Sequence, residues 1–501
     1  MSGATLQNAI RAEMAASLDR HAERTAVVGG GEVFTYAELG RRIREAAELL
    51  RSALPAGGHL GFCLANRAEL VILYFGALEA GCLPLLLDAS FNTCEIAAIR
   101  GDCALDALVV EKAKAEALDI PGKGEPLPFA EGVVVLPLAR DTEPPFTPRP
   151  DTEVCRFTSG TTGRPKCLEF SGHAVVSAAR NWVLGTSMSA DDRTLCLAAL
   201  SNGLAFNTSL LSTFLAGGAL HFLKGQPLTR PVARRVEEDG ITRLVAFPTL
   251  YRNFIAPGGP DRSALASLRY AISAGAPLWA DVRDEFRTRY GLDISDYYGI
   301  AETGPCTFER HAGYHSGLGE PLPGAEIRIV PGEEDAPGAG EVLVRTASMA
   351  SGYLNHPGLF EQRVDAEGFY HSGDRGRLTD GRLHLVGRTT DHINVAGRKI
   401  DPTEIVDLVS ALAGVEDAVA FPDEDLNREA LVHLAVVAPG GAVTRADLAE
   451  ACRARLAPWK VPGRISFVPE IPRNGIGKPR IAWLREQLHE QGSLQQKGPQ
   501  E

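Results

Sequence analysis

The sequence lacks the features of a secreted or membrane-spanning protein. Its nine cysteines never form a Cys-x-x-Cys pair, so reduced thiols are expected rather than a disulfide framework or a zinc site. The N-terminal residues have neither the charged nor the apolar stretch of a signal peptide. The most apolar run, residues 70–87, is interrupted by Glu79, Gly81 and Pro84, which argues against a membrane span. We therefore expect a cytoplasmic protein.

Basic residues are outnumbered by acidic ones. The chain has 51 Lys and Arg against 63 Asp and Glu, a formal net charge of -12, which argues against a general nucleic-acid binder. The rest of the composition is ordinary for a globular protein, with 45% hydrophobic and 23% charged residues. Because 501 residues are too many for one compact core, we expect two or more domains.

The functional prediction starts from residues 157–166, which read Phe-Thr-Ser-Gly-Thr-Thr-Gly-Arg-Pro-Lys. Glycines let a backbone approach a ligand closely, and inward-pointing amides make a nest for an anion. Hydroxyl donors and two cations, Arg164 and Lys166, complete a cradle for a polyphosphate. Composition alone would favour a polar surface loop, and the order of the residues changes that interpretation. The order of these residues differs from the Walker pattern, which needs Gly-Lys-Ser/Thr at the start of a helix. The candidate phosphate-binding residues are Thr158, Ser159, Gly160, Thr161, Thr162, Gly163 and Lys166.

This order of residues resembles the signature loop of the adenylate-forming superfamily, which includes acyl-CoA synthetases, adenylation domains of peptide synthetases and luciferases. A second stretch, residues 297–303, resembles the family's Tyr-Gly-x-Thr/Ala-Glu motif and includes Gly299. There the aromatic face of Tyr298 could stack on a nucleobase. The carboxylate of Glu302 suits Mg²⁺, and Thr303 could donate to the α-phosphate.

The resemblance implies further nucleotide contacts. Gly275, Ala276 and Pro277 form the turn that would present backbone to the adenine ring. Asp374, in a His-Ser-Gly-Asp stretch, matches the ribose-binding aspartate of the family, and Arg388 matches its arginine beside the ribose and phosphates.

Motifs toward the C-terminus match the parts of the family that act through a second domain. Lys478, in Pro-Arg-Asn-Gly-Ile-Gly-Lys, matches the catalytic lysine. Thr390 stands at the hinge position, where relatives have Asp or Lys. Gly397 and Arg398 lie in the loop that meets the pantetheine channel in CoA ligases.

The segment expected to line the acyl pocket spans residues 204–220 and is largely apolar, so it suits an apolar or aromatic acyl group. No acid occurs from 195 to 224, which disfavours an amino-acid substrate because a buried ammonium would lack a partner. Many acyl-CoA synthetases have a histidine at the position of Asn202. The pocket and gate candidates are Asn202, Gly203, Leu204 and Phe206.

Alternating strand and helix patterns predict an α/β fold with parallel-type sheets, a small β-rich subdomain, and a mobile α+β C-terminal domain. A capping box is expected at Thr35 and Glu38, a helix over 68–80, and a variable connection over 120–150. We place the large adenylation domain at 1–388, the small domain at 389–488, and a disordered tail at 489–501.

Together these features imply a free-standing ligase that activates a carboxylic acid with ATP and Mg²⁺ and passes the acyl group to CoA. No carrier segment follows position 478, so the thiol would be CoA or a separate carrier protein. Because Asn202 and Thr390 depart from the family pattern, an enzyme of only one half-reaction stays open. A nucleotide-binding regulatory protein on a decayed ligase scaffold is a further open alternative. The chain could also assemble as a homodimer.

Overall fold

A computed structural model describes most of the chain, and its two compact units are Met1–Thr158 with Lys166–Thr390, and a smaller one formed chiefly by Asp391–Glu501. Among the residues described, every helix is too short or too polar to cross a lipid bilayer. The described residues are 8–118, 120, 122, 124–139, 145–158, 165–275, 278–310, 317–332, 338–388, 393–396, 398–425, 428–441, 443–472, 479, 481, 484, 485, 487 and 488.

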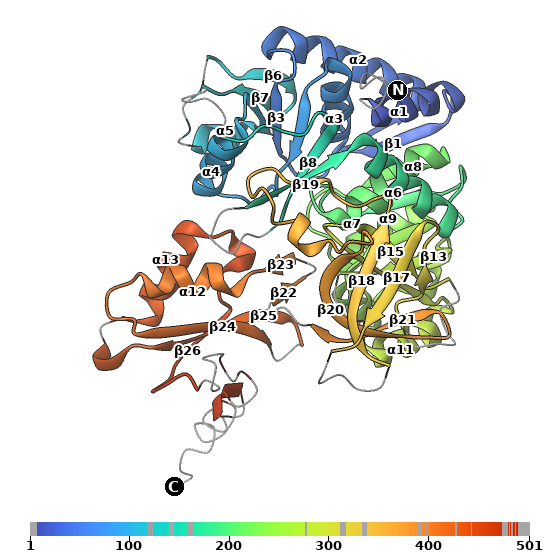
Figure 1. The fold of residues 1–501 in the computed structure, drawn as a ribbon. Helices are drawn as coiled ribbons and strands as arrows, with labels where there is room; N and C mark the ends of the chain where they lie inside the picture. Colours follow the sequence, from blue (N-terminus) through green and yellow to red (C-terminus); the bar gives the residue numbers. More distant parts are fainter. Residues whose placement is uncertain are drawn as a thin grey trace. The chain divides into compact units, whose positions relative to one another are not determined.

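One large sheet of the first unit has, over the described residues, eight strands in the order β19-β9-β8-β4-β3-β5-β7-β6 (Figure 1). Its centre is parallel, since β4 pairs with β3 and β8, and β3 pairs with β5. The strands are β3 (His59–Cys63), β4 (Leu83–Leu86), β5 (Ala107–Glu111), β6 (Leu127–Ala130), β7 (Val133–Pro137), β8 (Thr152–Thr158), β9 (Lys166–Ser171) and β19 (Gly352–Tyr353).

The second large sheet has nine strands in the described residues, in the order β16-β15-β14-β13-β12-β10-β11-β1-β2. Strands β1, β11, β10, β12, β13 and β14 pair in parallel, so their carboxyl ends share one edge. The strands are β1 (Thr25–Gly29), β2 (Glu32–Thr35), β10 (Arg193–Cys196), β11 (Ala219–Phe222), β12 (Arg243–Ala246), β13 (Tyr270–Ser273), β14 (Ile294–Ile300), β15 (Gly304–Phe308) and β16 (Glu320–Pro321).

A third, four-stranded antiparallel sheet forms the predicted β-rich part, seen in yellow and orange in Figure 1. It consists of β17 (Ala325–Val330), β18 (Gly340–Thr346), β20 (Tyr370–Thr379) and β21 (Arg382–Arg388). The smaller unit is an α+β fold of a two-stranded and a three-stranded sheet. Its elements are β22 (Ile393–Val395), β23 (Arg398–Ile400), α12 (Pro402–Ser410), β24 (Asp417–Glu424), β25 (Ala430–Val437), α13 (Arg445–Arg455) and β26 (Arg464–Phe467).

Helix α2 begins where the sequence signal predicts. Thr35 accepts from the backbone N–H of Glu38, whose carboxylate accepts from the N–H of Thr35, so the expected capping box starts α2. Gly76 lets α3 approach α2, since a Cβ there would lie 2.8 Å from the Cβ of Ala46. The helices are α1 (Ala9–Arg20), α2 (Tyr36–Ala53), α3 (Ala68–Ala80), α4 (Thr93–Cys103), α5 (Lys112–Ala117), α6 (Gly172–Gly185), α7 (Gly203–Ala205), α8 (Leu211–Ala216), α9 (Thr229–Asp239), α10 (Pro248–Ile255) and α11 (Ala280–Tyr290).

The predicted variable connection over 120–150 is wrong for its middle part. Residues 127–137 form the hairpin of β6 and β7, and β7 pairs antiparallel with β5 along its whole length. The reason is burial, because the valines of the run 133–135 are all buried although successive side chains point to opposite faces of the sheet.

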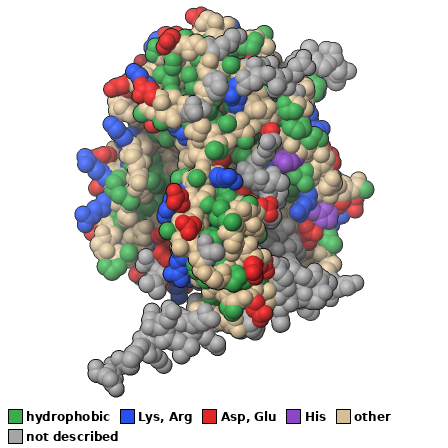
Figure 2. All heavy atoms as spheres, turned by 90° about the vertical axis from the view of Figure 1, so that its left-hand side faces the viewer, with side chains coloured by type: hydrophobic (Ala, Val, Ile, Leu, Met, Phe, Trp, Pro, Cys, Tyr) green, Lys and Arg blue, Asp and Glu red, His purple; other side chains and the backbone are tan. Residues whose placement is uncertain are grey.

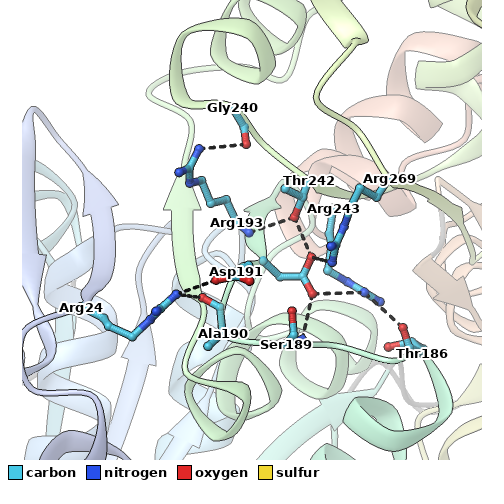
Figure 3. A network of polar contacts seen from close by, with 11 residues as sticks. Arg24, Thr186, Ser189, Ala190, Asp191, Arg193, Gly240, Thr242, Arg243 and Arg269 are labelled. Carbon is cyan, nitrogen blue, oxygen red and sulfur yellow. Dashed lines mark hydrogen bonds and ion pairs between the residues drawn. The ribbon is translucent and has the colours of Figure 1, made fainter.

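A buried carboxylate ties together the amino-terminal edge of the second sheet (Figure 3). Asp192, just before β10, accepts from the backbone N–H of Ser189 at 2.9 Å and from the hydroxyl of Thr242 at 2.7 Å. Arg269 donates to the same carboxylate at 2.7 Å, and Arg243 lies 3.7 Å from it. Because ligands of parallel sheets bind at the carboxyl ends, this network serves stability at the opposite edge.

Candidate active site

The predicted phosphate loop is carried by the hairpin of β8 and β9. Thr158, the last residue of β8, pairs with Lys166, the first residue of β9, and Phe157 pairs with Cys167. Both ends of the loop are therefore held side by side by strand pairing. The remaining candidates of this loop, Ser159, Gly160, Thr161, Thr162 and Gly163, lie outside the described residues.

The turn between β14 and β15 carries Glu302 and Thr303. The carboxylate of Glu302 accepts from the hydroxyl of Tyr353 at 2.8 Å, and its carbonyl accepts from the N–H of Ala350. Thr303 is fully buried. At Gly299 a Cβ would lie 2.6 Å from the carbonyl oxygen of Gly304, so only glycine fits where β14 meets β15.

Tyr298 and Asp374 meet although they come from different sheets. The phenolic hydroxyl of Tyr298 on β14 donates to Oδ2 of Asp374 on β20 at 2.7 Å. Asp374 stands opposite Arg388 in the β20–β21 ladder. Burial, with the neighbouring charge of Asp374 as the second cause, raises the pKa of Tyr298 well above its usual value. Three positions that the sequence assigns to the adenosine half of ATP are thus brought together.

The predicted adenine turn follows β13. Gly275 has a φ of +83°, a conformation that favours glycine. Ala276 and Pro277 lie outside the described residues.

The predicted acyl gate follows β10. The side chain of Asn202 caps the short helix α7 by accepting from the N–H of Leu204 at 2.9 Å. Gly203 is half-buried, whereas Leu204 and Phe206 are buried. Residues Phe206–Leu210 then form a π-helix in which all five residues are buried. Such wide turns occur frequently at functional sites, and nothing in the sequence pattern predicts this one.

The structure adds Arg156 of β8, a residue that the motif search missed. Its side chain is buried, and its Nη2 donates to the carbonyl of Ala301 at 3.4 Å. Burial lowers the pKa of Arg156 to about 10, so it remains a cation at neutral pH. The signal was present, since one arginine interrupts the apolar strand of Val154, Cys155 and Phe157.

In the smaller unit, Arg398 lies on β23 with its Cζ 5.2 Å from the ring centroid of Trp459. The fully buried Lys460 forms an ion pair with Glu404 at 2.8 Å. The catalytic candidate Lys478, the hinge candidate Thr390 and the channel candidate Gly397 lie outside the described residues.

Figure 2 shows one face of the molecule, where acidic and basic side chains are interspersed.

The residues present are compatible with Mg²⁺. Mg²⁺ in nucleotide sites is usually held by one or two carboxylates together with substrate phosphates, and Glu302 supplies one carboxylate in a tight turn. The described residues contain no group of three or more His, Cys, Asp or Glu that could hold a metal by themselves. A metal here would therefore depend on the phosphates of a nucleotide.

Two family models match the chain. The AMP-binding enzyme model covers residues 14–354, and the AMP-binding enzyme C-terminal domain model covers residues 404–478. A feruloyl-CoA synthase from Amycolatopsis sp is 30% identical over 91% of this chain and 94% of its own length. A 3-hydroxybenzoate–CoA/4-hydroxybenzoate–CoA ligase from Thauera aromatica is 26% identical over 93% of this chain and 94% of its own.

Among solved structures, the amide bond synthetase McbA from Marinactinospora thermotolerans is similar, with a TM-score of 0.81 and 26% identity over 95% of this chain and 99% of that one. The predicted mixed α/β class is therefore confirmed. The chain belongs to the AMP-binding enzyme family and is an adenylate-forming enzyme.

Proposed function

We propose that the protein is an acid–thiol ligase that converts a carboxylic acid and ATP into an acyl-adenylate and pyrophosphate, and then transfers the acyl group to CoA with release of AMP. The observation that carries the proposal is the contact between Tyr298 and Asp374. It supports a site in which an aromatic face and a ribose-binding carboxylate lie together.

The chemistry requires charge to be neutralised. A carboxylate is a poor electrophile, and joining it to AMP supplies a leaving group, but two anions must first approach. We assign the phosphates to the loop from Thr158 to Lys166, the ribose to Asp374 and Arg388, and the adenine to Gly275, Ala276, Pro277, Tyr298 and Gly299. Lys478 binds the carboxylate and α-phosphate oxygens as charge shifts. Mg²⁺, when bound by Glu302 and the phosphates, would stabilise the departing pyrophosphate.

The second half-reaction is assigned to the smaller domain, proposed to span 389–488. A turn at Thr390 would withdraw Lys478 and bring Gly397 and Arg398 to the thiol. Thiolate attack on the acyl carbon then breaks the bond to AMP. The names of the relatives support CoA as the thiol and an aromatic acid as substrate, in agreement with the apolar segment 204–220.

A second candidate acceptor is an amine. It is favoured by the similarity to an amide bond synthetase over nearly the whole length of both chains. An acyl-adenylate reacts with either nucleophile, so this alternative changes only the last step.

The test is a screen of aromatic and aliphatic acids with ATP and Mg²⁺. Pyrophosphate release is measured first without an acceptor, and AMP release is then measured with CoA, a carrier protein or an amine. We expect acid-dependent pyrophosphate release and a CoA-thioester by mass spectrometry. Thioester formation only from supplied acyl-AMP would indicate a single half-reaction, and a preference for amine over CoA would overturn the thiol assignment.

A further inference from the structure

A buried cation of the first unit makes no hydrogen bond to a carboxylate of the described residues. Arg156 is 3% exposed and forms no close ion pair with the described residues, so the carboxylate of Glu302 acts on it only through its charge. Its one hydrogen bond to them runs from Nη2 to the carbonyl of Ala301, at 3.4 Å, and its buried Nε donates to none of them. Burying a charge that no carboxylate contacts directly is costly, so a ligand that bonds to Arg156 would offset part of that cost.

Aromatic rings cover the faces of the guanidinium. Its Cζ lies 4.2 Å from the ring centroid of Phe170 and 4.9 Å from that of Phe206. Cation–π contact offsets part of the burial, but it engages only the faces of the group. The N–H donors lie in the guanidinium plane and point outward from its edge. The edge of Arg156 therefore keeps donors that the faces cannot satisfy.

That edge points to the place where two predicted site segments meet. Nη1 lies 2.7 Å from the position a Cβ on Gly203 would take, and this same position lies 3.9 Å from Cα of Ala301. Gly203 follows the gate residue Asn202, and Ala301 precedes Glu302. The donors of Arg156 thus lie beside both the acyl gate and the turn that carries Glu302.

We propose that Arg156 binds the reacting carboxylate of the acid substrate. This inference rests on the proposed function. A planar guanidinium pairs with a carboxylate through two parallel N–H···O bonds and is charged at neutral pH. The pair neutralises the acid before it meets the α-phosphate. Asn202 is neutral, so the charge comes from β8 instead of the gate.

Gly203 leaves room for the guanidinium of Arg156. A methyl group at this position would collide with Nη1, so glycine leaves the space that the guanidinium occupies. Gly203→Ala should displace Arg156 and raise the KM for the acid in the same direction as loss of the charge.

The first experiment measures acid-dependent ATP–pyrophosphate exchange by the full chain, with ferulate and 4-hydroxybenzoate as probes. Arg156→Gln is expected to lower kcat/KM for the acid by about 100-fold or more, the effect of losing one charge-stabilising donor, and to leave the KM for ATP nearly unchanged. Arg156→Lys should recover part of the loss, because it restores the charge without the bidentate geometry. Retention of kcat/KM within about threefold by Arg156→Gln would overturn the assignment.

A matched control separates binding from folding. Arg243 is also buried, also has a pKa lowered to about 10 by burial, and also stacks on an aromatic ring, that of Tyr270 at 4.4 Å. It is the first residue of β12, at the amino-terminal edge of the other large sheet, away from the predicted site residues at the carboxyl ends. Arg243→Gln is expected to lower the Tm without changing the KM for the acid. An equal effect of both variants on Tm and on acid KM would make Arg156 structural and refute the proposal.

Two further readouts respond only to carboxylate binding. Thioester formation from supplied acyl-AMP should survive in Arg156→Gln, because the acyl-adenylate has no free carboxylate. Asn202→His in the Arg156→Gln background should restore exchange chiefly below about pH 6.5, where imidazole is charged. Loss of the acyl-AMP step as well would contradict the proposal.

A panel of acid substrates shows which carboxylate Arg156 binds, the reacting one or a second anionic group of the same acid. If Arg156→Gln lowers kcat/KM only for acids with a second anionic group, the arginine binds that group and not the reacting carboxylate, which would overturn the assignment. If the wild type shows no exchange with any acid, the proposed function fails; calorimetric titration of 4-hydroxybenzoate and its amide then decides the inference separately. The inference is supported if the wild type binds the acid more tightly than the amide and Arg156→Gln loses this preference. It is refuted if the wild type and Arg156→Gln bind the acid with equal affinity.

Discussion

Tyr298 and Asp374 lie 76 positions apart, and their side chains meet in a hydrogen bond of 2.7 Å. One residue belongs to the mainly parallel sheet and the other to the four-stranded antiparallel sheet of the same unit. Both are buried. Because burial and the charge of Asp374 raise the pKa of Tyr298, its phenol stays protonated and keeps donating at neutral and moderately basic pH. The contact holds the carboxylate in place beside the aromatic ring.

The first prediction concerns nucleotide affinity. Asp374→Asn should weaken AMP binding by more than tenfold, because a hydrogen bond to a charged group contributes about 1.5–3 kcal/mol. Tyr298→Phe should have a smaller effect, since it keeps the aromatic face and the carboxylate. Calorimetric titration of AMP measures both. An unchanged affinity in Asp374→Asn would place the ribose elsewhere.

The structural features that could be predicted are those that depend on local sequence signals. The capping box at Thr35 and the helix over 68–80 depend on neighbouring residues, and the structure confirms both. The hairpin at 127–137 was hidden by surrounding Pro, Gly and Glu, because its stability comes from pairing with β5. Arg156 escaped because its neighbours Gly203 and Ala301 are distant in sequence and adjacent only after folding.

The second prediction concerns Glu302. Glu302→Gln keeps an acceptor for the hydroxyl of Tyr353 but removes the negative charge. The Mg²⁺ concentration for half-maximal exchange should therefore rise, and kcat should fall about 100-fold, as for other lost electrostatic contacts. Tyr353→Phe is the control, because it leaves the charge in place and should change kcat much less. A Glu302→Gln enzyme with normal Mg²⁺ dependence would remove this residue from the metal site.

The third prediction concerns the network at the amino-terminal edge of the second sheet. Asp192→Asn should lower the free energy of unfolding by about 3 kcal/mol, because Arg243 and Arg269 lose their buried counter-charge. Asp191→Asn is the control, since that side chain is 84% exposed and its loss should change stability by less than about 0.5 kcal/mol. Urea unfolding measures both. Equal stability of the two variants would show that the network contributes little.

The fourth prediction concerns pH and the smaller unit. His433 Nδ1 lies 2.8 Å from Asp423 Oδ2, and its Nε2 lies 2.9 Å from Ser466 Oγ. Burial lowers the pKa of His433 despite the charge of Asp423. The unfolded chain therefore binds this proton more readily, so the histidine's stabilisation is present above about pH 6.5 and is lost as pH falls toward the folded pKa.

His433→Gln should flatten this dependence. The free energy of unfolding of the wild type, minus that of the variant, should fall by at most about 1.4 kcal/mol per pH unit below pH 6.5. Urea unfolding at pH 5, 6, 7 and 8 measures the difference. A difference that is constant across these pH values would show that His433 titrates alike in the folded and unfolded states.

The most direct test of adenylate formation is acid-dependent ATP–pyrophosphate exchange by the wild type and by Lys478→Ala, with circular dichroism and thermal unfolding to compare their folding. We predict exchange by the wild type and its loss in Lys478→Ala, with AMP binding and Tm preserved. Exchange at the wild-type rate by Lys478→Ala would contradict the assigned role of the lysine. A wild type that binds ATP and exchanges with no acid would contradict the account itself.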